Sequence, residues 1–143
     1  MWQTLIAVIG TLAGVGMTSG YQARAARTAR RNADRTAGLD AVTALVEALA
    51  AHRRAMWLRE DLRLRGEDWA EARIESHTTR SAVTGPLLKV QLLMPAVGPQ
   101  AQNAARATYA LRGAPDGSGL AARREAAIAA CDSLVAAAGR HLT

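Results

Sequence analysis

Residues 39–65 read LDAVTALVEALAAHRRAMWLREDLRLR, and this stretch decides the expected fold. Its apolar side chains recur at three- and four-residue steps, which is the spacing of one face of an α-helix; they are Leu39, Val42, Leu45, Val46, Leu49 and Met56. Gly66 follows where a helix C-cap is expected, because glycine adopts a left-handed backbone conformation easily. The stretch therefore predicts an amphipathic helix that ends at Arg65.

A second helix is predicted from Glu67 or Asp68 to the residue before Pro95. The two carboxylates suit the positive end of a helix dipole. Gly85-Pro86 is expected to kink or interrupt this helix, because proline lacks a backbone N–H. Its apolar residues, which we expect to face the core, are Trp69, Ala72, Val83, Leu87, Leu88, Leu92 and Leu93.

The first two helices are predicted to form a hairpin that turns at Gly66. Counting outward from the turn places residues 87–88 opposite residues 45–46, so that the apolar parts of both helices meet. The charged stretch 59–75 then becomes a solvated tip.

Two further helices are predicted in the last third of the chain. One opens at Gly98-Pro99 and runs to Arg112, with Gly113 as its cap. The residues expected to share one face of it are Ala101, Ala104, Ala105, Thr108 and Leu111. The other follows the turn-rich stretch 113–119. Four amphipathic helices with short connections predict an all-α fold, an antiparallel four-helix-type bundle over residues 39–143.

The N-terminal segment, residues 1–21, is predicted to be a single transmembrane helix. From Trp2 to Tyr21 there is no charged side chain over 20 residues, and a helix of that length spans about 30 Å of hydrocarbon. Trp2 and Tyr21 stand at its ends, where aromatic rings prefer the membrane interface. A cleavable signal peptide is less favoured, because arginines follow at once.

Glycines within the predicted span suggest self-association. Gly10 and Gly14, like Gly16 and Gly20, are separated by three residues, a pattern that lets two membrane helices pack closely. A homo-oligomer is therefore expected. A holin-like or pore-forming assembly of the same helices is an alternative interpretation.

Residues 22–38 are predicted to be an arginine-rich juxtamembrane helix. They carry five arginines and one carboxylate, a net charge of +4, whereas the 105 residues that follow carry thirteen basic and eleven acidic side chains. The local excess is typical of the cytoplasmic side of a membrane anchor, which places the N-terminus outside and the bundle inside. Membrane-surface or phosphate binding is expected of Arg24, Arg27, Arg30, Arg31 and Arg35. Nucleic-acid binding is an alternative that the nearly neutral remainder disfavours.

No pattern in the chain predicts an enzyme, a metal or a cofactor. His52, His77 and His141 are scattered, without metal-ligand spacing. Cys131 is expected to be an inert core residue. The polar run 75–81 is expected to form a solvated or interhelical hydrogen-bonded surface. Trp57 and Trp69, on either side of the hairpin turn, form a candidate partner site if they are exposed.

Three stretches resemble a known family. They are MWLREDLRLRGEDWAEARIESHTTRSAV at residues 56–83, the opening MWQTLIAVIGTLAG, and ATYALRG at residues 107–113. The chain is similar here to the small KilB or spread proteins of actinobacterial conjugative plasmids and integrative elements. The resemblance implies membrane-associated help for the spread of element DNA between mycelial compartments, toxicity when unregulated, and other membrane or DNA-transfer proteins as partners. It supplies no catalytic residues.

Overall fold

The computed structural model describes the backbone of residues 2–142 and the side chains of residues 20–142. Helix α1 spans Trp2–Arg65, α2 spans Ala70–Leu93, α3 spans Gly98–Tyr109 and α4 spans Gly117–Leu142. A short 3-10 helix, η1, covers Pro95–Val97. The described chain is helical between its turns, which confirms the all-α prediction.

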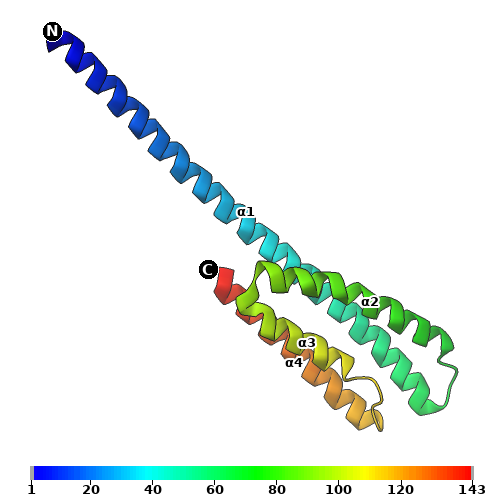
Figure 1. Cartoon of the computed structure of the whole chain (residues 1–143). Helices are drawn as coiled ribbons and strands as arrows, with labels where there is room; N and C mark the ends of the chain where they lie inside the picture. The colour runs from blue at the N-terminus through cyan, green and yellow to red at the C-terminus, as the bar shows by residue number, and fades with distance from the viewer. Residues whose placement is uncertain (1, 143) are drawn as a thin grey trace. The chain divides into compact units, whose positions relative to one another are not determined.

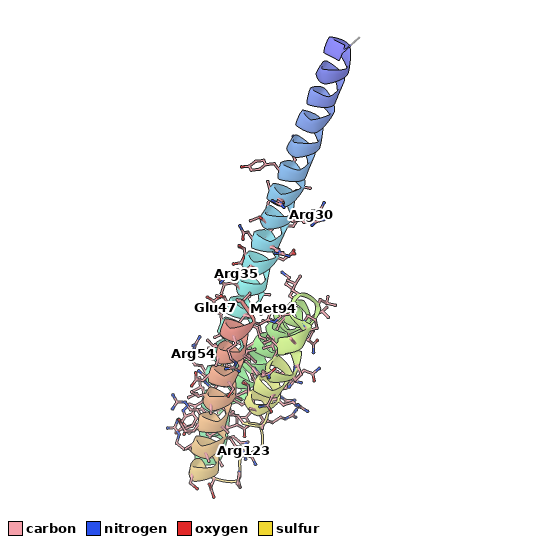
Figure 2. The ribbon with its side chains drawn as sticks, turned by 90° about the vertical axis from the view of Figure 1, so that its left-hand side faces the viewer. Arg30, Arg35, Glu47, Arg54, Met94 and Arg123 are labelled. Carbon is pink, nitrogen blue, oxygen red and sulfur yellow. The ribbon has the colours of Figure 1, made fainter. Side chains whose placement is uncertain are left out.

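The chain divides into two compact units, residues 1–36 and residues 37–143. In the first unit, every described side chain is exposed, and Figure 2 shows Arg30 and Arg35 pointing away from the ribbon. Within the described residues, no helix is long and apolar enough to cross a membrane. The predicted span lies outside the described side chains, except for Gly20 and Tyr21.

In the second unit, four helical segments lie side by side and alternate in direction (Figure 1). The turn between α1 and α2 follows from Gly66, whose φ is +70°. The N–H of Gly66 donates to the carbonyl of Arg63 at 3.2 Å, and that of Glu67 donates to the carbonyl of Leu62 at 3.0 Å. This pair of bonds is a Schellman cap. Glycine at residue 66 therefore ends α1 as the sequence predicts.

Small residues bring α3 close to its neighbours. Its buried side chains are Ala101, Ala104, Ala105 and Thr108, which is the face expected from the sequence. They meet a stripe of α4 that contains Ala130, Leu134, Ala137 and Ala138 in the main core. The remaining large side chains of this core come from α1, α2 and the segment of Met94 and Val97 that links α2 to α3. A second apolar cluster lies nearer the α1–α2 turn and contains Met56, Leu111 and Leu120.

The structure corrects the expected α2 in two respects. The helix is continuous through Pro86, so the interruption predicted at Gly85-Pro86 is wrong. Ala82, four residues earlier, is exposed, so the carbonyl that loses its helical donor can bond to water. The second correction concerns which side chains are buried. They are Ala72, Ser76, Val83 and Val90.

Three leucines expected in the core are exposed instead: Leu88, Leu92 and Leu93. The buried residues of α2 are separated by four, seven and seven positions, as in a narrow helix-packing seam. These leucines fall outside that seam. Leu87, which was also expected there, is partly buried against the main core.

Gly38 lies inside α1, which continues through it without a break. A Cβ at this position would lie 3.1 Å from Sδ of Met94 and 3.7 Å from Cδ2 of Leu142. The absent side chain thus allows α1 to pack closely against the start of η1 and the end of α4.

Candidate functional site

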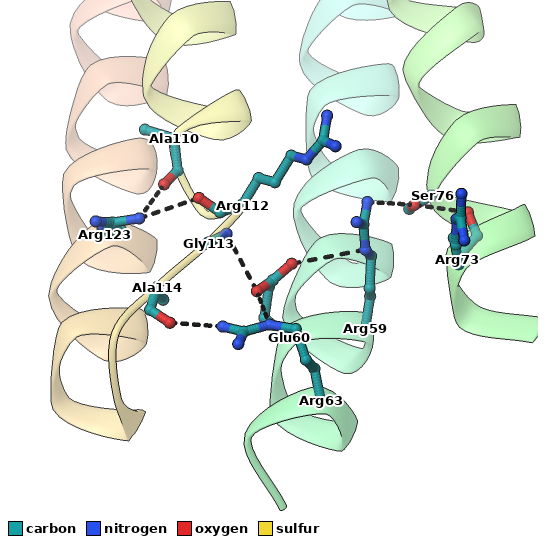
Figure 3. A network of polar contacts seen from close by, with 10 residues as sticks. All are labelled: Arg59, Glu60, Arg63, Arg73, Ser76, Ala110, Arg112, Gly113, Ala114 and Arg123. Atoms are coloured by element: carbon teal, nitrogen blue, oxygen red, sulfur yellow. Dashed lines mark hydrogen bonds and ion pairs between the residues drawn. The ribbon is translucent and has the colours of Figure 1, made fainter. Parts of the chain in front are cut away.

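The end of the bundle near the α1–α2 turn contains a buried polar network (Figure 3). The charged stretch 59–75 was expected to be a solvated tip, but Arg59 is only 7% exposed and Glu60 is fully buried. That prediction is wrong for these two residues, because Arg59 packs against Ser76 of α2 and Glu60 packs against the loop between α3 and α4. Asp61 nevertheless forms an exposed ion pair with Arg65, with a 2.7 Å N–O distance.

Glu60 connects α1 to the segment after α3. Its Oε2 accepts a hydrogen bond from Nε of Arg63 at 2.7 Å and from the backbone N–H of Gly113 at 3.1 Å. Arg63 also donates to the carbonyl of Ala114 at 2.6 Å. Gly113 has a φ of +70°, so the backbone turns where it meets the carboxylate. The carboxylate therefore anchors the α3–α4 loop to α1.

Arg59 connects α1 to α2. Its Nη1 donates to Oγ of Ser76 at 3.2 Å, and Ser76 donates to the carbonyl of Arg73 at 2.7 Å. Nε of Arg59 lies 3.6 Å from Oε1 of Glu60, and neither atom has a hydrogen-bond partner. Burial lowers the pKa of Arg59, as do the nearby charges of Arg112, Arg73 and Arg63. Only Glu60 acts in the opposite direction.

Arginines cover the aromatic rings of this region. The guanidinium carbon of Arg59 lies 5.3 Å from the ring centroid of Trp69, and that of Arg73 lies 5.8 Å away on the same ring. Arg124 lies 5.2 Å from the Trp57 ring. Such pairs are cation–π contacts. Both tryptophans are half-buried, so they are not bare apolar surfaces, and their role as a partner site stays a prediction.

His52 lies in the same region and is almost completely buried. Its Nδ1 lies 3.0 Å from Oγ1 of Thr79, and its ring contacts the Tyr109 ring edge-on at 5.5 Å. Burial lowers the pKa of His52 to about 4, with further contributions from Arg80 and Arg59. Thr79 and Ser76 belong to the polar run 75–81, which thus contributes interhelical hydrogen bonds as expected.

A second surface lies at the other end of the bundle, between the start of the second unit and the end of α2. It is a groove of about 530 Å³ with a mostly apolar lining. We call it the α1–α2 groove; it is lined by Ala37, Asp40, Ala41, Ala44, Lys89, Leu92 and Leu93. Leu92 is 71% exposed. None of the ion pairs found among the described residues involves Asp40 or Lys89.

Comparison with known proteins identifies the family. The KilB plasmid transfer protein family model matches residues 39–142, which is most of the chain. The chain belongs to the KilB family. It is 56% identical to Protein KilB of Streptomyces lividans over 144 aligned residues, covering 99% of this chain and 98% of the relative. The predicted resemblance is confirmed. No solved structure matches this chain.

The remaining predicted sites of this KilB-family chain fall in the first unit. Gly10, Gly14, Gly16 and Trp2 lie outside the described side chains. Gly20 has open space around it, and Tyr21 is 78% exposed. The arginines predicted to bind membrane or phosphate are all exposed; they are Arg24, Arg27, Arg30, Arg31 and Arg35.

Neither metal binding nor thiol chemistry is indicated in the described part of this KilB-family chain. No group of three His, Cys, Asp or Glu side chains there is arranged to bind a metal ion. Cys131 is buried on α4, and burial raises the pKa of its thiol.

Sequence reasoning missed the buried Arg59–Glu60 pair. The signal that was available is Met56, an apolar residue three positions before Arg59. Residues at this spacing share a helix face, and Met56 is buried.

Proposed function

We propose that this KilB-family chain is a non-enzymatic, membrane-anchored protein that pairs with a second copy and docks other components of plasmid transfer. The observation that carries the proposal is the α1–α2 groove, because it combines exposed leucines with small residues on one face. The family supports the role in plasmid transfer.

The groove has the features of a self-complementary surface. Ala37, Ala41 and Ala44 form a shallow floor on α1, and Leu92 and Leu93 project beside it from α2. In a twofold-symmetric dimer, both copies use the same surface. The two leucines of each copy can therefore pack against the three alanines of the other copy. Such a contact removes from water the leucines that the monomer leaves exposed.

Charge supports a second copy as the occupant of the groove. Asp40 on α1 and Lys89 on α2 line it from opposite helices. In a twofold dimer, Asp40 of each copy can approach Lys89 of the other. Both residues are exposed, so the pairs would lie at the rim of the contact and set its register more than its affinity.

Replacing Leu92 with glutamate is expected to weaken dimerisation about tenfold or more, because it places a charge in the apolar centre of the contact. The dissociation constant is measured by sedimentation equilibrium of the full chain in non-ionic detergent. Leu92 is exposed, so folding should be spared. Ile74→Glu is the matched control, since Ile74 is equally exposed on α2 but lies near the other end. Plasmid transfer frequency should fall with Leu92→Glu only.

A charge swap tests the same contact without changing its apolar part. Asp40→Lys and Lys89→Asp should each weaken the dimer, and the double variant should restore it. Unchanged association in Leu92→Glu, or no rescue in the double variant, would show that this surface is not the dimer contact.

The membrane anchor is supported by the uncharged segment from Trp2 to Tyr21 and by the exposed arginines that follow it. The full chain is expected to stay with the membrane pellet after an alkaline carbonate wash. Ile9→Asp should release it, because a carboxylate at the centre of a span costs about 3 kcal/mol of insertion free energy. Thr36→Asp, outside the segment, is the control. Equal release of the parent and both variants would contradict anchoring.

A further inference from the structure

A small cavity lies within the end of the bundle near the α1–α2 turn, between α1, α2 and the segment that follows α3. Its volume is about 50 Å³. We call it the tip cavity; it is lined by His52, Met56, Arg59, Ser76, His77, Arg80, Tyr109 and Arg112. Three of these side chains are arginines, and no carboxylate lines the cavity. The lining is thus strongly basic although the surrounding bundle is nearly neutral.

Among the three arginines of the tip cavity, only Arg59 belongs to an ion pair of the described residues, the one with Glu60. Glu60 is the carboxylate nearest to Arg59, and its Oε2 already accepts from Arg63 and Gly113. Ion pairs among the described residues include neither Arg80 nor Arg112. Arg80 and Arg112 are exposed, and both lie beside Arg59 with no carboxylate in the cavity lining. One anion among the three arginines would offset their mutual repulsion.

Two of the three arginines of the tip cavity, Arg59 and Arg80, are oriented by contacts within the protein. Arg59 is oriented by its hydrogen bond to Ser76. The guanidinium carbon of Arg80 lies 3.3 Å from the centroid of the Tyr109 ring. Stacking in this way leaves the N–H donors at the guanidinium edge available. Arg112 extends from the end of α3 towards α1 (Figure 3).

We propose that the tip cavity binds one phosphate-type oxyanion, either inorganic phosphate or the terminal phosphate of a small ligand. Guanidinium groups recognise phosphate through paired, charge-assisted hydrogen bonds. The cavity has room for only a few water-sized groups, which suits one tetrahedral anion. A nucleic-acid backbone presents a row of phosphates and needs an open basic strip, so its binding is the competing outcome. This site does not depend on the groove or the anchor.

Isothermal titration of the full chain in non-ionic detergent with sodium phosphate tests the proposal, with sodium chloride at equal ionic strength as the blank. We expect saturable binding of phosphate with a dissociation constant below about 20 mM. Arg112→Gln should weaken this binding about tenfold, because it removes one charge-assisted contact. Arg106→Gln is the matched control, because Arg106 on α3 is exposed like Arg112 but does not line the cavity. Both variants replace exposed side chains, so folding should be unaffected.

The pKa of His52 provides a second test. It should change on addition of phosphate only if the anion binds beside the arginines, and not if these arginines serve only the fold. Arg80 and Arg59 both help to lower the pKa of His52 to about 4. An anion between these arginines offsets their charge, so phosphate should raise the pKa of His52. The imidazole signal is followed by NMR titration, with exposed His141 as an internal control.

Three results would overturn the proposal. The first is the absence of saturable phosphate binding to the parent chain. The second is equal binding by Arg112→Gln and Arg106→Gln, which would indicate general charge attraction. The third is tight binding of duplex DNA that depends on Arg112, without any binding of inorganic phosphate or of glycerol 3-phosphate. That result would assign the tip to a nucleic-acid surface. Binding of glycerol 3-phosphate in preference to inorganic phosphate would support the small-ligand form.

Discussion

Replacing Glu60 with glutamine is expected to lower the free energy of unfolding by about 3–5 kcal/mol, the cost of breaking a buried ion pair by removing one partner. The variant keeps the shape of the side chain but removes its charge. Buried Arg59 then has no compensating carboxylate, and the bonds from Arg63 and Gly113 become weaker. The measurement is urea unfolding of the full chain in non-ionic detergent, followed by far-ultraviolet circular dichroism.

Asp61→Asn is the matched control for Glu60→Gln. Asp61 is the next residue on α1 and also pairs with an arginine, Arg65, but both partners are substantially exposed. Exposed pairs contribute about 0–1 kcal/mol, so this variant should be nearly neutral. If both substitutions were equally mild, the Glu60 network would add no more stability than a surface ion pair.

Replacing Leu45 with alanine is expected to lower the free energy of unfolding by about 3–5 kcal/mol, because it removes buried methyl groups and leaves a cavity. Leu45 is fully buried in the main core, which it shares with Val83, Val90 and Leu134. The α3 residues of this core are alanines, whose side chains are too short to fill the cavity. The same unfolding measurement applies.

Leu58→Ala is the control on the same helix, since Leu58 is 51% exposed. It should change stability by no more than about 0.5 kcal/mol, as for surface substitutions in general. A small effect at Leu45 would mean that the bundle relaxes to fill the cavity, so that the alanine-rich α3–α4 contact is less rigid than its burial suggests.

Turn chemistry and small-residue periodicity were enough to predict much of the fold. Gly66 and Gly113 both have a φ of +70°, but only Gly66 caps a helix as predicted, because α3 ends at Tyr109 and not at Arg112. The buried residues of α3 are those predicted from their three- and four-residue spacing in the sequence. A short helix with one apolar stripe can turn only that stripe towards a core. These signals are local, so they can be read without knowing the neighbouring helices.

Properties set by distant segments could not be predicted in this way. α2 has more leucines than its contact surface can accommodate, and only the packing of the other helices decides that Val90 is buried while Leu92 is exposed. Arg59 and Glu60 look like surface charges in sequence. Glu60 is buried because a loop more than fifty residues later supplies Gly113, and Arg59 is buried against Ser76 of α2. The tip cavity and the groove both arise from such long-range contacts.

The single thiol of the chain, that of Cys131, can report on opening of the bundle through its rate of chemical modification. Cys131 is buried on α4, and its raised pKa disfavours the thiolate that reacts with labelling reagents. Modification therefore requires the helices around it to separate transiently, so its rate follows the population of open molecules when opening is fast. No engineered probe is needed to follow how ligands or partners shift that population.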